Sequence, residues 1–399
     1  MLNDPDPEGG IPVSTPESAR VLFIFGTRPE AIKLCPVIRH MRRNGKGLEV
    51  RVCVTAQHRG MLDQVLECFE VRPDCDLDLM QPGQTLGETT ARVLTALDPV
   101  LARETPAITV VQGDTTTTMA GAMAAFYRRV PVAHVEAGLR TGDLAQPFPE
   151  EFNRLVTSRV AALHFAPTEW ARRNLLAEGV PEERILVTGN SGIDAIVDVA
   201  GALQHGRLPA PAWPWLDSSR KLIVVTAHRR ESFGEGLERI CDAFAELASR
   251  PDVQIVYPVH RNPQVLDPVT RRLGGHPHIV LTEPLDYVSF VDLMRRAYLI
   301  VTDSGGIQEE APSLGKPVLV LRERTERPEA VEAGTVKLVG SDPRRIVTEA
   351  AWLLDDPSEY ERRSRTHNPY GDGRTSRRIT AAIVKYLGVS AENTGSSIG

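Results

Sequence analysis

Residues 303–310, Asp-Ser-Gly-Gly-Ile-Gln-Glu-Glu, directly follow the apolar run 298–302 and start a helical pattern. Two adjacent glycines let an anion approach the backbone, and the free amides and positive dipole end of a helix favour negative charge. The pattern predicts a phosphate site at Ser304, Gly305 and Gly306 and a ligand that carries a diphosphate. An ordinary strand-to-helix turn is the alternative, because a lone glycine pair is a weak signal.

Basic residues that could hold a diphosphate follow two other apolar runs. Arg28 and Lys33 bracket the start of a predicted helix, in which Pro29 suits the first turn. Together they fit an anion clamp, although each alone is more often a solvated surface cation. His228 follows the run 221–225 beside two arginines, and it is a candidate contact for a phosphate or a leaving group. A structural role is the alternative for this histidine.

Three acidic residues also follow predicted strands or start a helix: Asp114, Glu136 and Glu150. Ligands of open parallel sheets bind at the carboxyl ends of the strands, so these carboxylates should face the predicted phosphate site. Carboxylates crowded in a shielded cleft resist ionisation, which permits acid and base roles. Simpler readings are that Asp114 caps the next helix and that Glu150 is favoured by a helix dipole.

Composition sets limits on the class of protein. The chain has 399 residues, 42% of them hydrophobic, and a formal net charge of −6, so we expect two folded domains with no bulk attraction for nucleic acid. The five cysteines form no C-x-x-C pair, which predicts reduced thiols, no zinc site and a cytoplasmic protein. Apolar runs are far shorter than a membrane span, and the acidic start lacks the features of a signal peptide.

Short apolar runs followed by helical patterns occur in two series. This is typical of parallel sheets covered on both faces, and it predicts an α/β protein with two such blocks. The runs are 21–25, 50–54, 107–111 and 130–135 in the first block, and 221–225, 253–257, 278–281, 298–301 and 317–321 in the second. Neither G-x-G-x-x-G after a strand nor G-x-x-x-x-G-K-[ST] is present, which argues against a nicotinamide dehydrogenase and a P-loop enzyme.

The predicted boundaries follow from these series. They are a flexible arm at 1–19, a first domain at 20–187, a second domain at 188–374 and a flexible tail at 389–399. A final helix at about 375–388 has one apolar face and could pack on either domain.

Taken together, the motifs resemble those of non-hydrolysing UDP-N-acetylglucosamine 2-epimerases over roughly residues 20–388. They are Gly-Thr-Arg-Pro-Glu-Ala-Ile-Lys at 26–33, Gln-His-Arg at 57–59, Gly-Asp-Thr-Thr at 113–116, His-Val-Glu-Ala-Gly-Leu-Arg at 134–140, Pro-Phe-Pro-Glu-Glu at 147–151, His-Arg-Arg-Glu at 228–231, the octapeptide 303–310 and Thr-Glu-Arg-Pro-Glu at 325–329. The resemblance implies two Rossmann-like domains similar to the GT-B glycosyltransferase fold, an active site in the cleft between them, and a last helix that returns to the first domain. It also implies a UDP-sugar substrate, a homodimer, and no metal or redox cofactor.

The resemblance further implies a mechanism and a role for each candidate residue. UDP and the carbon-2 proton of UDP-N-acetylglucosamine are eliminated to give 2-acetamidoglucal, and re-addition gives the epimer UDP-N-acetylmannosamine. Asp114 and Glu136 match the proton-transfer groups, and Glu150 matches a supporting acid or base. The remaining matches are His228, Arg28 and Lys33 at the diphosphate, Ser304, Gly305 and Gly306 at a phosphate, Glu310 at the ribose and Phe290 against the uracil.

One departure from the family concerns regulation. Members with a regulatory UDP-N-acetylglucosamine pocket have polar side chains where this chain has Gly60 and, nearby, Gly83. This difference leaves activation by substrate an open question for this chain. Three other classes share parts of the pattern: a sugar-nucleotide glycosyltransferase, a sugar-nucleotide sensor without catalysis, and a hydrolysing epimerase that releases N-acetylmannosamine and UDP.

Overall fold

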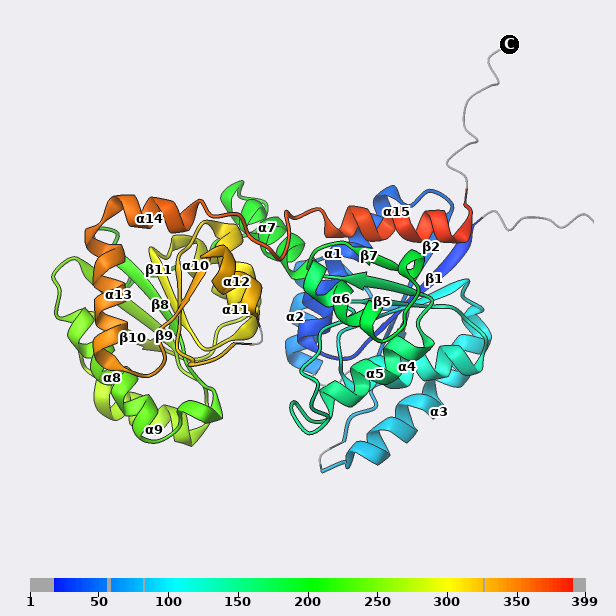
Figure 1. The fold of residues 1–399 in the computed structure, drawn as a ribbon, viewed down its shortest axis with the longest axis horizontal. Coiled ribbons are helices and arrows are strands. Elements are labelled where there is room, and N and C mark those ends of the chain that lie inside the picture. The colour runs from blue at the N-terminus through cyan, green and yellow to red at the C-terminus, as the bar shows by residue number, and fades with distance from the viewer. Residues whose placement is uncertain (1–17, 56–58, 82, 326, 390–399) are drawn as a thin grey trace, which may run out of the picture.

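Two parallel β-sheets, each flanked by helices, make up the computed structural model (Figure 1), which describes residues 18–55, 59–81, 83–325 and 327–389. The predicted α/β architecture with two blocks is confirmed. Within the described ranges, no helix combines the length and the apolar character needed to cross a bilayer.

The first sheet has seven strands in the order β3-β2-β1-β4-β5-β6-β7, and all of its pairings are parallel. Its strands are β1 Ala19–Phe25, β2 Leu48–Val54, β3 Cys75–Asp76, β4 Ile108–Gln112, β5 Val132–Val135, β6 Leu163–Ala166 and β7 Ile185–Val187. The connecting helices are α1 Arg28–Asn44, α2 Arg59–Cys68, α3 Leu86–Glu104, α4 Thr116–Tyr127, α5 Glu150–Val160, α6 Glu169–Ala177 and the 3-10 turn η1 Glu182–Arg184.

Alternation along β1 shows how this sheet is covered on both faces. Val21, Phe23 and Phe25 pack with the apolar side of α1, whereas Leu22 and Ile24 point the other way, toward α3 and α4. All five are at most 1% exposed. Successive side chains of a strand point to opposite faces, so a strand that is apolar at every position must be buried on both.

The second sheet has six parallel strands in the order β10-β9-β8-β11-β12-β13. They are β8 Lys221–Thr226, β9 Val253–Pro258, β10 Ile279–Thr282, β11 Leu299–Thr302, β12 Val318–Val320 and β13 Val336–Leu338. Its helical elements are η2 Arg230–Ser232, α8 Glu235–Ala248, α9 Pro263–Leu273, α10 Tyr287–Arg296, α11 Gly305–Glu310, η3 Ala311–Leu314, α12 Pro328–Ala333, α13 Pro343–Asp355 and α14 Pro357–Ser364.

The strand order reverses once in each sheet, between β1 and β4 and between β8 and β11. At such a switch point the connections leave on opposite faces, so a crevice opens at the carboxyl ends of the two strands. The turns that follow β1, β4, β8 and β11 carry Arg28, Asp114, His228 and Ser304. The topology therefore places most of the predicted site at these two crevices.

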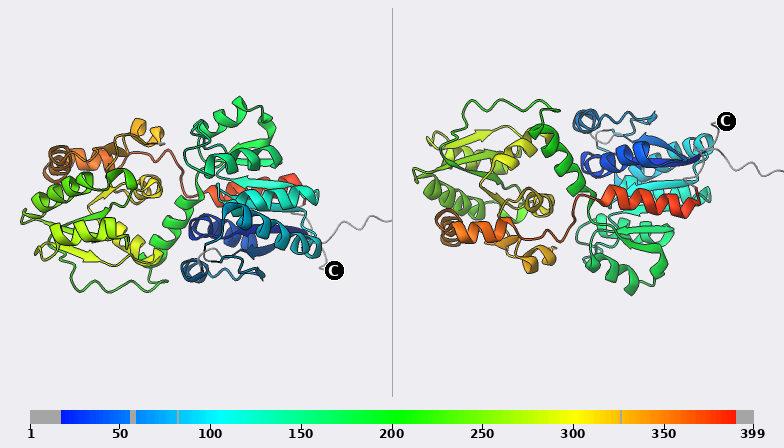
Figure 2. Two further views of the ribbon diagram at one scale, coloured as in Figure 1. Left: turned by 90° about the horizontal axis from the view of Figure 1, so that it is seen from below. Right: turned by 90° about the horizontal axis from the view of Figure 1, so that it is seen from above.

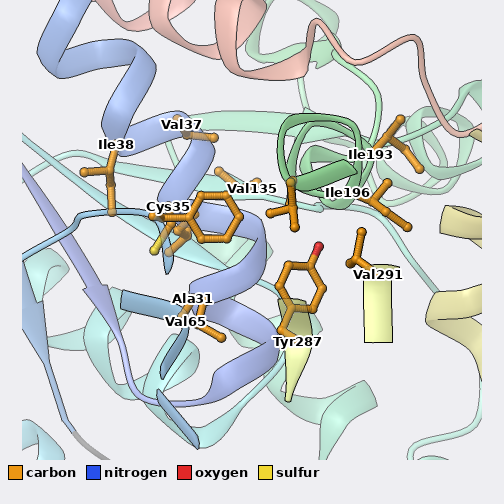
Figure 3. Packing of buried hydrophobic residues seen from close by; sticks show 14 of the residues in the cluster. Ala31, Cys35, Val37, Ile38, Val65, Val135, Ile193, Ile196, Tyr287 and Val291 are labelled. Atoms are coloured by element: carbon orange, nitrogen blue, oxygen red, sulfur yellow. The ribbon is translucent and has the colours of Figure 1, made fainter. Parts of the chain in front are cut away.

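Each sheet with its flanking helices is called a unit below. Helix α7, Ser191–Gln204, packs against α1 of the first unit and against α10 and α11 of the second. Ile193 and Ile196 of α7, Cys35 of α1 and Val291 of α10 belong to one buried apolar cluster that continues from one unit into the other (Figure 3). Helix α7 is thus a shared element, although the predicted boundary at 188 would assign it to the second domain alone. The division of the chain into domains remains a prediction.

The last helix, α15 Thr375–Leu387, runs alongside α1 (Figure 2), as the resemblance implied. Its first turn is capped by another helix, because the Asp194 carboxylate of α7 accepts hydrogen bonds from the amides of Thr375 (3.1 Å) and Ser376 (2.7 Å). The chain therefore crosses between the units twice. The two crossings are joined where the Asn190 amide donates to the Tyr370 carbonyl, at 2.7 Å.

Candidate active site

A cavity of about 430 Å³ lies between the two units. Arg28 and Lys33 of α1 line it from one side, and residues that follow β8 and β11 or belong to α10 line it from the other. Seven of the predicted site residues form part of its wall: Arg28, Lys33, His228, Phe290, Ser304, Gly306 and Glu310.

A capping box fixes the start of α1 beside this cavity. The Thr27 hydroxyl accepts from the Glu30 amide, and the Glu30 carboxylate accepts from the amides of Gly26 and Thr27. The other Glu30 oxygen accepts from the hydroxyls of Thr115 and Thr118 at the start of α4. Both switch-point turns of the first sheet are thereby tied to one buried carboxylate, which holds the start of α1 in place.

Glu136 follows β5 and points at Lys33. The Lys33 ammonium lies 2.5 Å and 2.6 Å from the two Glu136 oxygens, and the Gln112 amide also donates to this carboxylate. Burial lowers the pKa of Lys33, but the Glu136 and Glu309 carboxylates raise it further, so the ammonium form is favoured. Glu136 has a left-handed backbone, φ 66°, a strained conformation that is frequent at functional sites.

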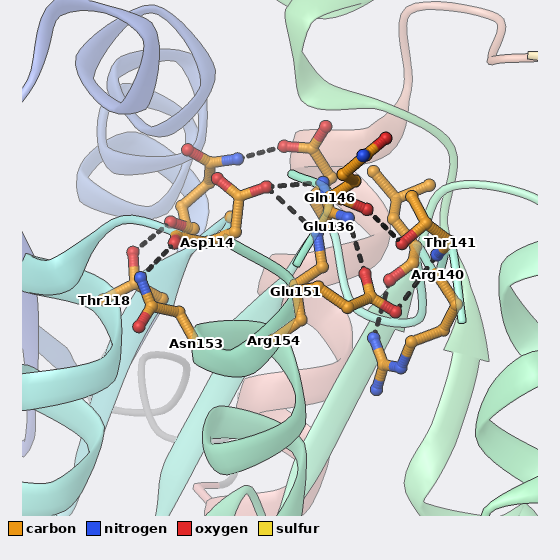
Figure 4. Close-up of polar contacts among 12 residues, drawn as sticks. Asp114, Thr118, Glu136, Arg140, Thr141, Gln146, Glu151, Asn153 and Arg154 are labelled. Carbon is orange, nitrogen blue, oxygen red and sulfur yellow. Dashed lines mark hydrogen bonds and ion pairs between the residues drawn. The ribbon is translucent and has the colours of Figure 1, made fainter. Parts of the chain in front are cut away.

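Asp114 lies on the neighbouring turn and faces Arg154 of α5 (Figure 4). The Arg154 guanidinium donates to one Asp114 oxygen at 2.7 Å and 3.0 Å, and it also pairs with the buried Glu151. Burial raises the pKa of Asp114, Arg154 counteracts this shift and Glu136 adds to it. The reading of Asp114 as a helix cap is wrong, because the Thr115 hydroxyl caps α4.

The turns that carry Asp114 and Glu136 are bonded to each other. The Gly113 amide donates to the Val135 carbonyl at 3.0 Å, and Nε2 of His134 lies 2.7 Å from the Gly113 carbonyl. Burial lowers the pKa of His134 to about 3, so this histidine is neutral and donates from Nε2. These bonds hold the turns of Asp114 and Glu136 in fixed relative positions. Because His134 is neutral, it adds no positive charge next to these turns.

Asp303 organises the second crevice. Its carboxylate accepts from the amides of His228 (2.6 Å) and Arg229 (2.7 Å), and its other oxygen lies 3.4 Å from Nδ1 of His228. The His228 ring stacks on His260 with centroids 5.5 Å apart. Burial lowers the pKa of His228 although Asp303 opposes this shift, which favours the neutral imidazole.

The predicted phosphate site at Ser304, Gly305 and Gly306, called the phosphate cradle below, lies at the start of α11. This helix of six residues continues into η3. Ser304 is its N-cap, and its hydroxyl makes no capping hydrogen bond. Gly305 is packed tightly, because an added Cβ would lie 2.5 Å from the Arg327 guanidinium carbon. Arg327 in turn donates to Glu309 at 2.6 Å.

Glu310, the last residue of α11, also lines the cavity. Burial raises the pKa of Glu310 to about 8; Glu309 adds to this rise, and Lys33 and Arg28 counteract it. The hydroxyl of Tyr287, which also lines the cavity, is buried and has no hydrogen-bond partner among the described residues. The cavity thus offers polar groups at this end that a ligand with hydroxyls could satisfy.

Comparison with known proteins places this geometry in a family. The family model described as UDP-N-acetylglucosamine 2-epimerase matches residues 40–384. The chain belongs to this family, in its non-hydrolysing group. It is 58% identical to UDP-N-acetylglucosamine 2-epimerase of Salmonella typhimurium over 372 residues, which cover 92% of this chain and 99% of that protein. The Escherichia coli K12 enzyme is 56% identical over 369 residues, 91% of this chain and 98% of that protein.

Solved structures agree with the assignment to the epimerase family. The Neisseria meningitidis UDP-GlcNAc 2-epimerase bound to UDP-GlcNAc has a TM-score of 0.84 at 47% identity, over 92% of this chain and 100% of that chain. A kitacinnamycin glycotransferase has a TM-score of 0.64 at 13% identity over 93% and 100%, which is a likeness of fold alone. The expected similarity to the GT-B fold and the expected enzyme class are confirmed.

Not every predicted site residue joins the cavity of this epimerase. Asp114 and Glu136 do not line the cavity, and Glu136 is connected to it by its ion pair with Lys33. Glu150 is the first residue of α5, and no hydrogen bond or ion pair links its carboxylate to another described residue. Gly305 is part of the cradle without lining the cavity.

The structure describes only part of the segment in which the regulatory departure lies. Gly60 lies in α2 and Gly83 has φ 76°, whereas residues 57, 58 and 82 lie outside the described part of the chain. In the described ranges no three His, Cys, Asp or Glu side chains are grouped so that they could hold a metal ion.

Three residues of the site were missed at the sequence level: Gln112, Arg154 and Arg327. Each acts by pairing with a carboxylate, at Glu136, Asp114 and Glu309 respectively. Arg154 follows Glu151 by three residues on a predicted helix, a spacing that allows an ion pair and could have drawn notice.

Proposed function

We propose that this protein interconverts UDP-N-acetylglucosamine and UDP-N-acetylmannosamine by elimination and re-addition of UDP. The reaction breaks the bond between carbon 1 and the UDP oxygen and removes the proton from carbon 2, giving 2-acetamidoglucal and UDP. Re-addition forms the carbon–oxygen bond again and delivers a proton to the opposite face of carbon 2. No other reactant is consumed.

The observation that carries this proposal is the pair of carboxylates, Asp114 and Glu136, held on turns that are bonded to each other, with Glu136 paired to Lys33 in the cavity wall. Removal and return of a proton on opposite faces needs two such groups. The pKa of Asp114 is raised, so it lies closer to pH 7 than that of an ordinary aspartic acid. This makes both uptake and release of a proton by Asp114 easier. In the same proposal Glu150 is a supporting acid or base.

The opposite wall is suited to the departing UDP. Arg28 and His228 line the cavity close to the start of α11, where Ser304 and the two glycine amides could hold a phosphate. Charge develops on the UDP oxygen as the bond breaks, so donors placed there in advance would lower the barrier. In the same proposal Glu310 holds the ribose hydroxyls and Phe290 lies against the uracil. UDP-bearing complexes of the Neisseria meningitidis and Methanocaldococcus jannaschii relatives support this choice of ligand.

Incubation of the purified protein with UDP-N-acetylglucosamine in deuterated water tests the mechanism. We expect deuterium at carbon 2 of both recovered UDP-sugars, because each turnover exchanges that proton, and a trace of 2-acetamidoglucal with free UDP. An epimerised product without deuterium would refute elimination. Release of N-acetylmannosamine with UDP would instead indicate the hydrolysing enzyme.

A homodimer and a cytoplasmic location also belong to the proposal. The mass of the protein in solution, measured by light scattering, checks the first of these.

A further inference from the structure

Cys53 of β2 and Cys75 of β3 are register partners on neighbouring parallel strands. Such strands lie about 4.8 Å apart, inside the range of about 4.4–6.8 Å that a disulfide requires between Cα atoms. Cys53 is fully buried in the apolar layer beneath α3, and Cys75 is half-buried at the rim of that layer. Strand β3 has only two residues and lies at the edge of the sheet, so it can adjust to a new bond.

The surroundings of the two thiols differ in charge. A hydrogen bond from Cys53 lowers the pKa of Cys75 to about 6, and Arg103 at the end of α3 contributes to this shift against burial and Glu104. The same contact, together with burial, raises the pKa of Cys53. Burial likewise raises the pKa of Cys68 to about 11 and that of Cys241 to about 12. Thiolate, not thiol, is the nucleophile, so both its charge surroundings and its partial exposure favour Cys75 over Cys53 as the attacking thiol.

We propose that Cys53 and Cys75 form a peroxide-responsive thiol pair. The Cys75 thiolate attacks a hydroperoxide, its sulfur takes one oxygen to become a sulfenic acid, and the peroxide is reduced to hydroxide or alcohol. The Cys53 thiol then attacks this sulfur, a disulfide forms, and the oxygen leaves as water. The disulfide joins an edge strand to its neighbour. The proposal does not depend on the epimerase reaction.

Treatment of the reduced full-length protein with stoichiometric hydrogen peroxide, followed by alkylation and peptide mass spectrometry, tests the pair. We expect loss of two hydrogen atoms, a cross-linked peptide that joins Cys53 and Cys75, and recovery of both thiols with dithiothreitol. With iodoacetamide at pH 7, Cys75 should react at least about tenfold faster than Cys241. Five unmodified cysteines after peroxide, or equal oxidation of Cys68 and Cys241, would overturn the proposal.

Single substitutions separate the two roles. In Cys53→Ala, the sulfenic acid at Cys75 should persist and be trapped by dimedone, because no resolving thiol remains. Cys75→Ser should abolish peroxide-dependent loss of the Cys53 thiol. The matched control Cys241→Ala should form the disulfide at the parent rate. If Cys75→Ser leaves oxidation of Cys53 unchanged, Cys75 is not the attacking thiol and the proposal fails.

Discussion

Asp114 and Glu136 each face a cation, Arg154 and Lys33 respectively, and the proposed reaction assigns proton transfer to both. Replacing either acid by its amide keeps its size and removes its basicity. General acid–base catalysis contributes about 10²–10⁴-fold, so Asp114→Asn and Glu136→Gln should each lose at least about 100-fold in turnover. Steady-state rates measure this loss.

The same two variants should bind UDP nearly as the parent does, because neither acid is assigned to the nucleotide. Calorimetric titration with UDP checks this, and Asp143→Asn, in the exposed loop before α5, is the matched control. Near-normal turnover, or a loss of turnover that follows only from lost UDP binding, contradicts the roles given to these acids.

Glu310 should make the stability of the ligand-free protein depend on pH. Its pKa is about 8 in the fold against 4.5 for a freely solvated glutamic acid, so the folded state holds a proton that the unfolded state releases between these values. Stability contributed by this group is therefore complete below pH 4.5 and is lost as pH rises to 8. Glu310→Gln removes the titration, and its melting temperature relative to the parent should rise steadily across this pH range.

Melting curves at several pH values, without nucleotide, measure this difference. Glu332→Gln, at an exposed position of α12, serves as the control and should follow the parent. A difference between Glu310→Gln and the parent that does not change with pH would mean that Glu310 is not protonated in the empty cleft.

At the scale of single elements, the start of α11 tests how tightly the cradle is built. A Cβ at Gly305 would meet the Arg327 guanidinium at 2.5 Å, whereas a Cβ at Gly306 would meet its nearest neighbour, a Glu310 oxygen, at 3.7 Å. Gly305→Ala should thus displace Arg327 from Glu309 and cost about 1–3 kcal/mol of unfolding free energy. Gly306→Ala should be neutral or slightly stabilising, since alanine favours helix.

Denaturant titration of the ligand-free variants measures both changes. Equal stability of the two would show that Arg327 moves aside without cost.

Strands that lie in clear apolar runs were predicted, and this includes β12, whose run 317–321 extends beyond its three residues. Runs such as 21–25 and 221–225 lie in β1 and β8, which are buried on both faces. Strands β3 and β13, of two and three residues, were missed because so few residues show no periodicity. Strand β7, with three residues, was missed for the same reason. Strand β6 was also missed, although it has four residues.

The candidate site was predictable where it depended on chain position and unpredictable where it depended on side-chain partners. Placing Arg28, His228 and Ser304 after strands located them at the crevices, as the parallel topology requires. The pairing of Asp114 with Arg154 joins residues 40 positions apart, and only the tertiary packing of α5 against the β4 turn determines it. For the same reason the sequence could not show that Glu150 has no such partner among the described residues.

On the scale of the whole molecule, α7 and α15 are joined by one carboxylate. Asp194→Ala would leave the buried amides of Thr375 and Ser376 without an acceptor, which should lower the unfolding free energy by about 1–3 kcal/mol. Asp194→Asn keeps one acceptor oxygen and should lose less. Chemical denaturation compares the variants, and Asp198→Ala, exposed on the next turn of α7, is the control. Parent-like stability of Asp194→Ala would mean that α15 does not need this cap.

The bond between Asn190 and Tyr370 has a mechanical consequence. Both connections between the two units pass through one point, and glycines flank it at 189 and 371, with φ 90° and 149°. Two chain segments that are bonded side by side act as a hinge. Such a hinge lets one unit rotate toward the other but resists sliding and twisting between them. We therefore expect the two walls of the cleft to return to the same relative position each time it closes. In the proposed reaction, the UDP and the sugar intermediate would then recombine against the same protein groups that separated them.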